Sequence, residues 1–290
     1  MINASIETVI EGAKQTVKSA RRWIKPLARL GYAAKGTVYF LIGTTAILVA
    51  LGRRGKAADF TGVLIQIFQE PFGGALLAML TVGLIGYSLW CLVQAIMDTE
   101  NKGNTIFGII TRLFYAGVAI VYAGIAWSAV QLLMQIGAVR EGDKPEQEWT
   151  ARFLRLLPYG RWIVAIVGAG FIGFCFYELR RAFGNKLRIL KTERQNPTED
   201  LLATRIAQIG ITARAAVFAL IGFFLSRAGI YVDPKRVRGI SGVLGTLVQE
   251  PYGPWLLTIV AVGLISYGIY MLFLSWRRRL DLAANNHSRG

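Results

Sequence analysis

Histidine and cysteine are nearly absent from this 290-residue chain, which contains one histidine and two cysteines. The histidine, His287, lies in a polar C-terminal tail, so bis-histidine haem sites and histidine-based metal centres are excluded. Cys91 and Cys175 lie in separate apolar segments, as packing thiols do more often than redox pairs. The sequence also lacks a phosphate-binding loop, a nucleophile elbow and an HExxH motif. We therefore expect a protein that is not an enzyme and has no cofactor or metal.

Charged residues are scarce as well, at 17% of the chain against about a quarter in soluble domains. Hydrophobic residues make up 54% of the chain and gather in long blocks. The blocks cover residues 36–51, 72–97, 113–139, 160–177, 215–226 and 251–275. About 18 such residues span a bilayer as a helix, and the fifth block reaches that length if Arg214 and Arg227 lie at the two interfaces. The sequence predicts an all-α polytopic membrane protein with six transmembrane helices.

Basic residues outnumber acidic ones, 33 to 17, which gives a net charge of +16. Most of the lysines and arginines flank the predicted spans on the side that also holds both termini. The positive-inside rule then predicts a multi-pass protein of the inner (plasma) membrane with cytoplasmic N- and C-termini. Because topology explains the basic excess, we expect no nucleic-acid partner. We expect instead that the basic face contacts anionic membrane lipid.

The first 26 residues predict an amphipathic helix on the cytoplasmic membrane surface. Apolar residues recur at helical spacing, and the cations gather late in the segment on the polar side. A signal peptide would place its positive charge first and follow it with an uninterrupted apolar core. A soluble helix that packs on another cytoplasmic segment is the alternative. Residues 280–290 form a polar tail.

The most informative pattern is an internal repeat. QEPFGGALLAMLTVGLIGY at 69–87 recurs as QEPYGPWLLTIVAVGLISY at 249–267, and ARLGYAAKGTVYFLIG at 28–43 recurs as AQIGITARAAVFALIG at 207–222. A fainter copy lies between them. The predicted copies cover 27–98, 108–184 and 205–279, with a cytoplasmic linker at 185–204. Each copy has an even number of spans, so the three copies should be parallel and adopt a pseudo-threefold arrangement.

Each copy also contains a short amphipathic segment before its second span. In residues 60–71 and 240–251, apolar side chains recur at i, i+3, i+4 and i+7. Thr61 and Ser241 lie near the starts of these segments as candidate N-caps. The middle copy has its own version at 149–158. We expect three helices on the outer membrane surface, each too short to span the bilayer.

With its RxGYAAKG-type opening and its PFG…GLxGY second half, the repeat resembles the bacterial integral-membrane family named domain of unknown function 1206. The resemblance covers the chain from Leu27 to Arg279. It implies a helical membrane protein of three two-helix repeats, and it brings no reaction and no catalytic residues. The middle copy departs from the pattern, because it lacks the QE before its proline and the cation that Lys35 and Arg214 supply.

Glycines at helical spacing mark candidate packing faces in all three copies. Small residues on a shared face let helix backbones approach closely in lipid, where packing drives association. A glycine-lined permeation path is the alternative interpretation. The candidate packing glycines are Gly36, Gly43, Gly83, Gly86, Gly117, Gly124, Gly170, Gly173, Gly222 and Gly263.

Four ionisable residues repeat between the outer copies. Glu70 and Glu250 each precede a proline, as an acid does at a helix start with proline at N1; an outer-face cation or proton site is the alternative. Lys35 and Arg214 occupy matching positions near the inner ends of their spans, where snorkelling cations can contact tyrosine rings. A ring of cations that attracts an anionic substrate or headgroup is the sharper alternative. The candidate lipid or anion contacts are Lys35, Arg214, Lys14, Lys18, Arg21 and Arg22.

Two classes of function remain open. The sequence shows no recognisable pair of buried charges at mid-membrane, and its connections are short. Both features favour a non-catalytic membrane scaffold or accessory subunit that contacts other integral membrane proteins or anionic lipid. The alternative is a small-solute channel or carrier that uses the pseudo-threefold axis. The sequence sets no oligomeric state.

Overall fold

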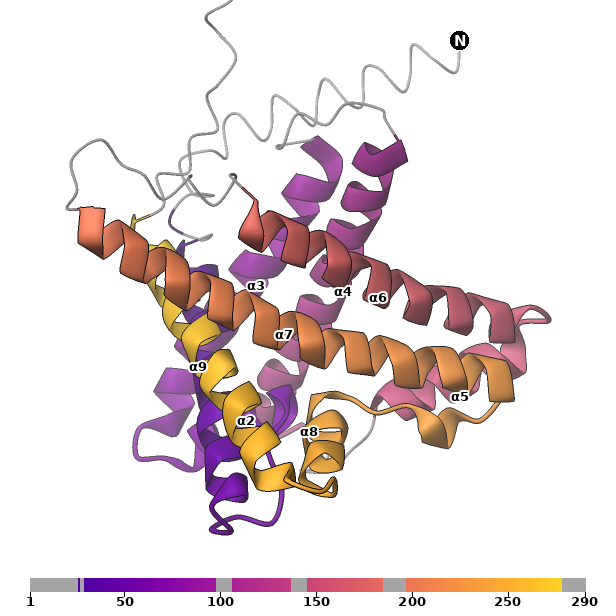
Figure 1. The fold of residues 1–290 in the computed structure, drawn as a ribbon, viewed down its shortest axis with the longest axis horizontal. Helices are drawn as coiled ribbons and strands as arrows, with labels where there is room; N and C mark the ends of the chain where they lie inside the picture. Colours follow the sequence, from indigo (N-terminus) through magenta and orange to yellow (C-terminus); the bar gives the residue numbers. More distant parts are fainter. Residues whose placement is uncertain (1–25, 27–28, 98–105, 137–144, 185–196, 278–290) are drawn as a thin grey trace, which may run out of the picture. The chain divides into compact units, whose positions relative to one another are not determined.

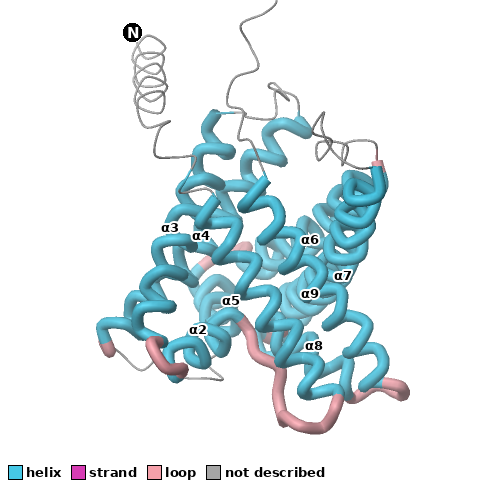
Figure 2. The backbone as a smooth tube through the Cα atoms, turned by 90° about the vertical axis from the view of Figure 1, so that its left-hand side faces the viewer, coloured by secondary structure: helices cyan, strands magenta, loops and turns pink. Residues whose placement is uncertain are grey.

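The computed structural model describes residues 26, 29–97, 106–136, 145–184 and 197–277. Every regular element in these ranges is helical, and they contain no strand (Figure 1, Figure 2). The helix predicted over residues 1–26 lies outside the described residues except for its last position, and the tail at 280–290 lies outside them entirely. The same is true of the candidate lipid contacts Lys14, Lys18, Arg21 and Arg22.

Six helices of the described chain are long and apolar enough to cross a membrane. They are the first helix (Arg29–Ala50), α3 (Gly73–Met97), α4 (Ile106–Met134), α6 (Gly160–Phe183), α7 (Pro197–Tyr231) and α9 (Gly253–Arg277). This confirms the predicted all-helical class and the six candidate spans. The agreement has a simple cause, since a helix satisfies every backbone polar group of an apolar segment within the segment itself.

Helix α7 corrects the predicted fifth span. Its membrane-length part is Leu201–Tyr231, so Arg214 lies inside the helix and does not flank it. Apolar residues that precede Arg214, among them Ile206 and Ile209, extend the hydrophobic stretch beyond the block at 215–226. The helix also begins at Pro197, within the segment predicted as a cytoplasmic linker.

Three short helices precede the second spans: α2 (Phe60–Gln69), α5 (Pro145–Leu156) and α8 (Ile240–Val248). A 3-10 turn, η2 (Pro234–Arg236), lies between α7 and α8. The predicted N-caps are wrong. Asp59 caps α2, where its Oδ1 accepts the Gly62 N–H at 2.8 Å, and Gly239 occupies the N-cap of α8. Thr61 and Ser241 each lie inside the first turn.

The first spans of the three copies end in the same way. Gly52 follows the first helix at φ 69°, and its N–H and that of the next residue donate to carbonyls of the last turn at 2.9 Å. Gln135 after α4 and Val232 after α7 both have φ 53°. At each, the N–H of the residue and that of the next residue donate to carbonyls of the last helical turn, as they do at Gly52. This is the Schellman arrangement, whose left-handed residue is usually glycine. The shared cap is structural evidence of the repeat that does not depend on sequence matches.

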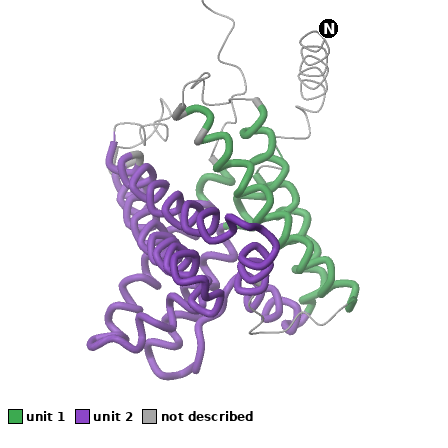
Figure 3. Tube along the Cα trace, turned by 90° about the vertical axis from the view of Figure 1, so that its right-hand side faces the viewer, with its two compact units in different colours: residues 1–35, 72–136, 273–290 green, residues 36–71, 137–272 purple. Residues whose placement is uncertain are grey.

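The described chain divides into two compact units, drawn in green and purple in Figure 3. Unit 1 contains the first helix up to Lys35, together with α3 and α4. Unit 2 contains the first helix from Gly36 onward, the helices from α5 to α8, and α9 up to Leu272. The middle copy is thus split, with α4 in one unit and α6 in the other.

In unit 1, glycines bring the first helix against α3. A Cβ built on Gly83 would lie 2.7 Å from the Ala34 Cβ and 2.9 Å from the Leu30 carbonyl oxygen. One built on Gly31 would lie 2.7 Å from the backbone nitrogen of Tyr87. Two helices can approach this closely only where a residue has no side chain. Helix α4 packs on the same helix α3.

In unit 2, helix α7 meets α9 through the equivalent residues. Gly263 lies against Ala213, and Gly210 lies against the backbone of Tyr267. These contacts match those of Gly83 with Ala34 and of Gly31 with Tyr87 in unit 1. The two outer copies therefore fold their helix pairs with the same glycine contacts.

Other glycines of unit 2 join helices of different copies. A Cβ on Gly36 would lie 2.8 Å from the Gly268 carbonyl oxygen, and one on Gly43 would lie 2.8 Å from the Ala261 carbonyl oxygen, so the first helix packs on α9. A Cβ on Gly222 would lie 2.7 Å from the Gly168 carbonyl oxygen, which joins α7 to α6. Helices α6 and α7 run side by side along their lengths (Figure 1).

The middle copy differs from this pattern. Gly117, Gly124, Gly170 and Gly173 are exposed, and no described atom lies within 4 Å of a Cβ built at any of them. Within each unit, therefore, these four predicted packing glycines do not lie against a neighbouring described helix. Gly86, by contrast, is buried in unit 1.

Candidate functional site

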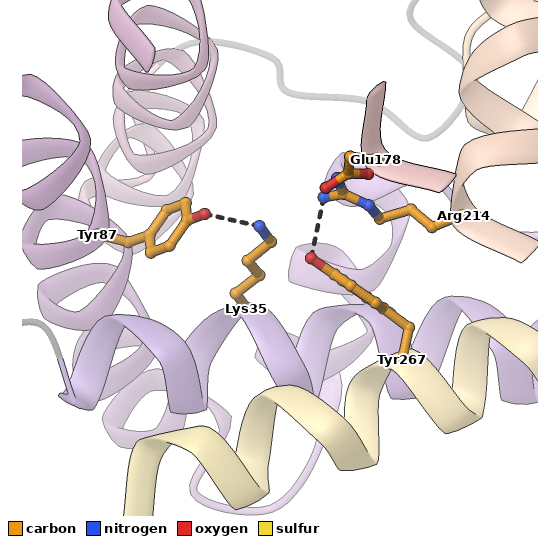
Figure 4. A network of polar contacts seen from close by, with 5 residues as sticks. All are labelled: Lys35, Tyr87, Glu178, Arg214 and Tyr267. Atoms are coloured by element: carbon orange, nitrogen blue, oxygen red, sulfur yellow. Dashed lines mark hydrogen bonds and ion pairs between the residues drawn. The ribbon is translucent and has the colours of Figure 1, made fainter. Parts of the chain in front are cut away.

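Two buried cations are the most distinctive polar groups in the described spans (Figure 4). Lys35 is 4% exposed and Arg214 is 7% exposed. Both side chains lie among packed helices and do not extend to the surface of the protein. An ionisable group inside a membrane span is a functional candidate by default, since its burial is costly.

In unit 1, Lys35 forms a cation–tyrosine cluster. Its Nζ donates to the Tyr87 hydroxyl at 2.7 Å and lies 4.5 Å from the centroid of the Tyr87 ring. The Tyr122 ring of α4 is 5.4 Å from the same Nζ, and the Tyr87 and Tyr122 rings meet edge to face at 4.6 Å. The cluster thus joins the first helix, α3 and α4.

In unit 2, Arg214 forms a cluster of the same kind with an added carboxylate. Its Nη1 donates to the Tyr267 hydroxyl at 2.9 Å, and its Nη2 forms a short ion pair with Oε2 of Glu178. The guanidinium carbon lies 4.7 Å from the Tyr267 ring centroid and 5.2 Å from that of Phe218. Figure 4 shows the guanidinium of Arg214 between Glu178 and Tyr267. The cluster joins α6, α7 and α9.

The aromatic part of this cluster extends to the surface helix α2. Tyr39 of the first helix meets the Tyr267 ring edge to face at 4.9 Å, and Phe60 of α2 meets Tyr39 at 5.6 Å. A continuous row of rings therefore runs from α2 to Arg214 within unit 2.

The repeat explains why the two clusters resemble each other. Lys35 and Arg214 follow Gly31 and Gly210 by one helical turn, and those glycines lie against the backbones of Tyr87 and Tyr267. The close approach brings each tyrosine hydroxyl within reach of its cation. The middle copy has phenylalanine, Phe174, at the tyrosine position. One turn later it places Glu178, which pairs with the cation of the next copy.

The predicted outer-face acids do not form a comparable cluster. Glu70 and Glu250 are exposed in the turns between α2 and α3 and between α8 and α9. The proline at N1 is also wrong, because Phe72 and Tyr252 intervene at positive φ before the long helices begin. No group of three or more His, Cys, Asp or Glu that could hold a metal ion occurs among the described residues.

Glu178 is an ionisable residue close to the inner boundary of its span, where it could simply lie in the headgroup zone, and the sequence analysis does not count it among the candidate contacts. The sequence shows it near the end of an apolar block, and nothing local indicates its partner, which lies 36 residues away. The packing glycines Gly31 and Gly210 could have been predicted from the sequence, since they align with each other in the two repeated stretches.

The register of the middle copy was recoverable too. TRLFYA at 111–116 matches ARLGYA at 28–33, two residues away from the match based on Gly117 and Gly124. In that register Ala119 and Ala126 correspond to Gly36 and Gly43, and both alanines are buried. Two residues are more than half a helical turn, so the two registers align different faces of α4 with the face of the first helix that holds Gly36 and Gly43.

The described chain thus has six candidate membrane spans, as expected of a multi-pass helical protein, and two buried cation–tyrosine clusters. The model of the Domain of Unknown Function (DUF1206) family matches this chain three times, over residues 30–98, 113–184 and 209–278. The chain therefore belongs to the DUF1206 family, and each matched segment holds two long helices.

A relative in Bacillus subtilis (strain 168), the uncharacterised protein YxxB, is 36% identical over 259 residues. The match covers 88% of this chain and 91% of the relative. No solved structure matches the chain.

Proposed function

We propose that the six spans form three parallel two-helix copies in the plasma membrane, related by a pseudo-threefold axis, with both termini in the cytoplasm. The even number of spans in each copy and the shared Schellman ends support this arrangement. Within the units, the second helix of one copy packs on the first helix of the next, as α3 does on α4 and α6 does on α7. Helices α2, α5 and α8 would then lie on the outer surface.

Thiol labelling in oriented membranes tests this topology. Cysteines introduced near Lys56 and near Lys191 should react from opposite sides of the membrane. Reaction of both from the same side would contradict the parallel arrangement.

For function, we propose a small-solute carrier with the Arg214–Glu178–Tyr267 cluster as its charged centre. The observation that supports the proposal is a buried ion pair between two membrane-length helices, in which Glu178 lies near the C-terminal end of α6. Replacing a buried ion pair by apolar residues is often neutral or stabilising, so helix packing alone gives little reason to keep one. The cation–tyrosine pair has also persisted in two copies whose surrounding residues have diverged.

The burial of the centre favours a carrier over a channel. Arg214 is 7% exposed, so a solute can reach it only after the helices move. A channel would instead require an open, water-filled path at the same place.

A native thiol makes the carrier testable without a known solute. Cys175 lies on α6 one turn before Glu178, is buried, and interacts electrostatically with both Glu178 and Arg214. In the Cys91→Ser variant it is the only cysteine of the chain. The carrier predicts that a water-soluble methanethiosulfonate reagent labels Cys175 in the folded, detergent-solubilised protein. A thiol that reacts only after denaturation would refute the carrier.

A membrane scaffold or accessory subunit is the second candidate, and one observation favours it. Only 22% and 17% of the residues in the most apolar windows of α4 and α6 are buried, against 50% for α3, and Gly117, Gly124, Gly170 and Gly173 are exposed. Exposed glycines on a span permit close approach of a helix from another membrane protein. Purification in native lipid followed by mass spectrometry should then recover a stoichiometric partner. Recovery of the chain alone would count against a scaffold.

We also propose that the cytoplasmic face binds anionic lipid. Each cation near an anionic bilayer contributes about 1 kcal/mol. Replacement of Lys14, Lys18, Arg21 and Arg22 by glutamine should reduce the anionic lipid that co-purifies with the protein while leaving the helix content unchanged. An unchanged lipid profile would limit these charges to setting topology.

A further inference from the structure

We infer that Arg214 is an oxyanion-binding residue and that Glu178 is its resident counter-ion, which leaves the guanidinium on taking up a proton. The inference rests on the proposed carrier function and names the chemistry of its solute. The solute would carry a carboxylate, phosphate or sulfonate group.

The hydrogen bonds of Arg214 support this assignment. Its Nη1 donates to the Tyr267 hydroxyl and its Nη2 to Glu178, whereas its buried Nε–H has no acceptor among the described residues. A buried donor without a partner is rare in a folded protein. The guanidinium presents its donors as a planar fork that matches the two oxygens of a carboxylate or phosphate. The arrangement is therefore an incompletely occupied oxyanion site, with one oxygen of Glu178 in part of it.

Glu178 is the group of this cluster that can leave Arg214. Its side chain is 19% exposed, against 8% for that of Arg214, so it is the less buried member of the pair. The other groups that face the pair are Tyr267 on α9, Tyr39 on the first helix and Cys175 on α6, and Tyr270 of α9 lies against Tyr267. Phenols and guanidinium groups keep their charge state under mild acidification, whereas a carboxylate gains a proton. Protonation therefore acts on Glu178 and removes its attraction for Arg214.

The exchange conserves charge at the centre. Before it, the positive guanidinium faces the negative carboxylate. Afterwards Oε2 of Glu178 carries a proton taken from water, its ion pair with Nη2 is broken, and the oxyanion of the solute occupies the vacated donors. One proton and one monovalent anion enter together, so the centre stays neutral. This matters because an uncompensated charge in a membrane span is costly.

The exchange also predicts how binding depends on pH. If one proton is taken up for each anion bound, linkage requires the apparent dissociation constant to rise about tenfold for each pH unit while Glu178 is ionised. Affinity is thus highest in acid and falls as pH rises.

Methanesulfonate is a suitable probe, because it stays ionised from pH 5 to pH 8 and any pH dependence then belongs to the protein. Cys175 labelling in the Cys91→Ser protein would be followed with and without the anion. At each pH the rate is titrated with the anion, and the midpoint of that titration does not depend on the ionisation of the thiol itself. We expect methanesulfonate to slow labelling, with a half-effective concentration that rises about tenfold per pH unit.

Three variants test the roles of the residues. Glu178→Gln should keep the anion effect and abolish its pH dependence, whereas Arg214→Gln should abolish the effect itself. Arg236→Gln is the control, because it removes an equal charge from a surface ion pair with Asp233 and should behave like the parent. If Arg214→Gln does not fold, the inference is still tested by how the half-effective concentration changes with pH in the parent and in Glu178→Gln.

An oxyanion can come from solution or from a lipid headgroup, and nanodiscs separate these sources. Protection by methanesulfonate in phosphatidylcholine discs identifies a soluble anion. Protection by phosphatidylglycerol without added anion, with the same pH slope, identifies a headgroup. A labelling rate that neither anion changes, or a parent slope that is flat with pH, overturns the inference while leaving the carrier in place. An unreactive Cys175 instead refutes the carrier itself.

Discussion

Removal of one partner from the Arg214–Glu178 pair should destabilise the protein far more than removal of both. Methionine is a suitable replacement, because it is unbranched, matches glutamate in length and replaces the aliphatic part of arginine. Loss of one member of a buried pair costs about 3–5 kcal/mol, since the other charge is left uncompensated. We expect about 3 kcal/mol for Glu178→Met, because Glu178 is 19% exposed and Arg214 keeps its bond to Tyr267. Arg214→Met should cost about 4 kcal/mol, because it also removes the charged bond to that tyrosine.

The double variant should be less destabilised than either single variant, to within about 1 kcal/mol of the parent. Unfolding by dodecyl sulfate in mixed micelles, followed by tryptophan fluorescence, measures all four proteins under the same conditions. If the two single effects simply add in the double variant, the residues do not form a buried, coupled pair. A stable double variant that no longer responds to oxyanions would indicate that the pair is retained for binding.

Three further predictions concern the fold. Gly31→Ala should destabilise the protein by about 1–3 kcal/mol in the same unfolding assay, because its Cβ would lie 2.7 Å from the Tyr87 nitrogen. Gly117→Ala should be neutral or stabilising, because no described atom lies within 4 Å of a Cβ built there. Val232→Gly should stabilise by about 1 kcal/mol, because a β-branched residue at φ 53° is strained; an unchanged midpoint would argue against the Schellman cap. Asp59→Ala should cost about 1 kcal/mol through loss of the α2 N-cap, and a larger effect of Thr61→Ala would return that role to the threonine.

The spans were predictable because their signal is local. A block of apolar residues long enough to cross a bilayer defines its own helix, and α3 and α9 begin and end within two residues of the blocks at 72–97 and 251–275. Helix α7 was not predictable in full, because Arg214 interrupts its block. Its charge is compensated by Glu178 from another copy, a contact that no local pattern records.

The clusters were predictable in part for the same reason. Duplication placed Lys35 and Arg214 in register with their tyrosines, and that register can be read from the two aligned stretches. The carboxylate has no counterpart in the outer copies, where Cys91 and Met271 stand at its position. Only packing between copies reveals that it completes the site.

The central claim is that Arg214 lies at a centre which solutes reach from both sides of the membrane. The most direct measurement is the labelling of Cys175, in the Cys91→Ser protein, by an impermeant thiol reagent added to right-side-out and to inside-out vesicles. The account predicts reaction in both preparations, with both rates lowered by methanesulfonate at acidic pH. Reaction in neither preparation would show a closed structural ion pair, and reaction from one side alone would show a binding pocket that is not part of a carrier.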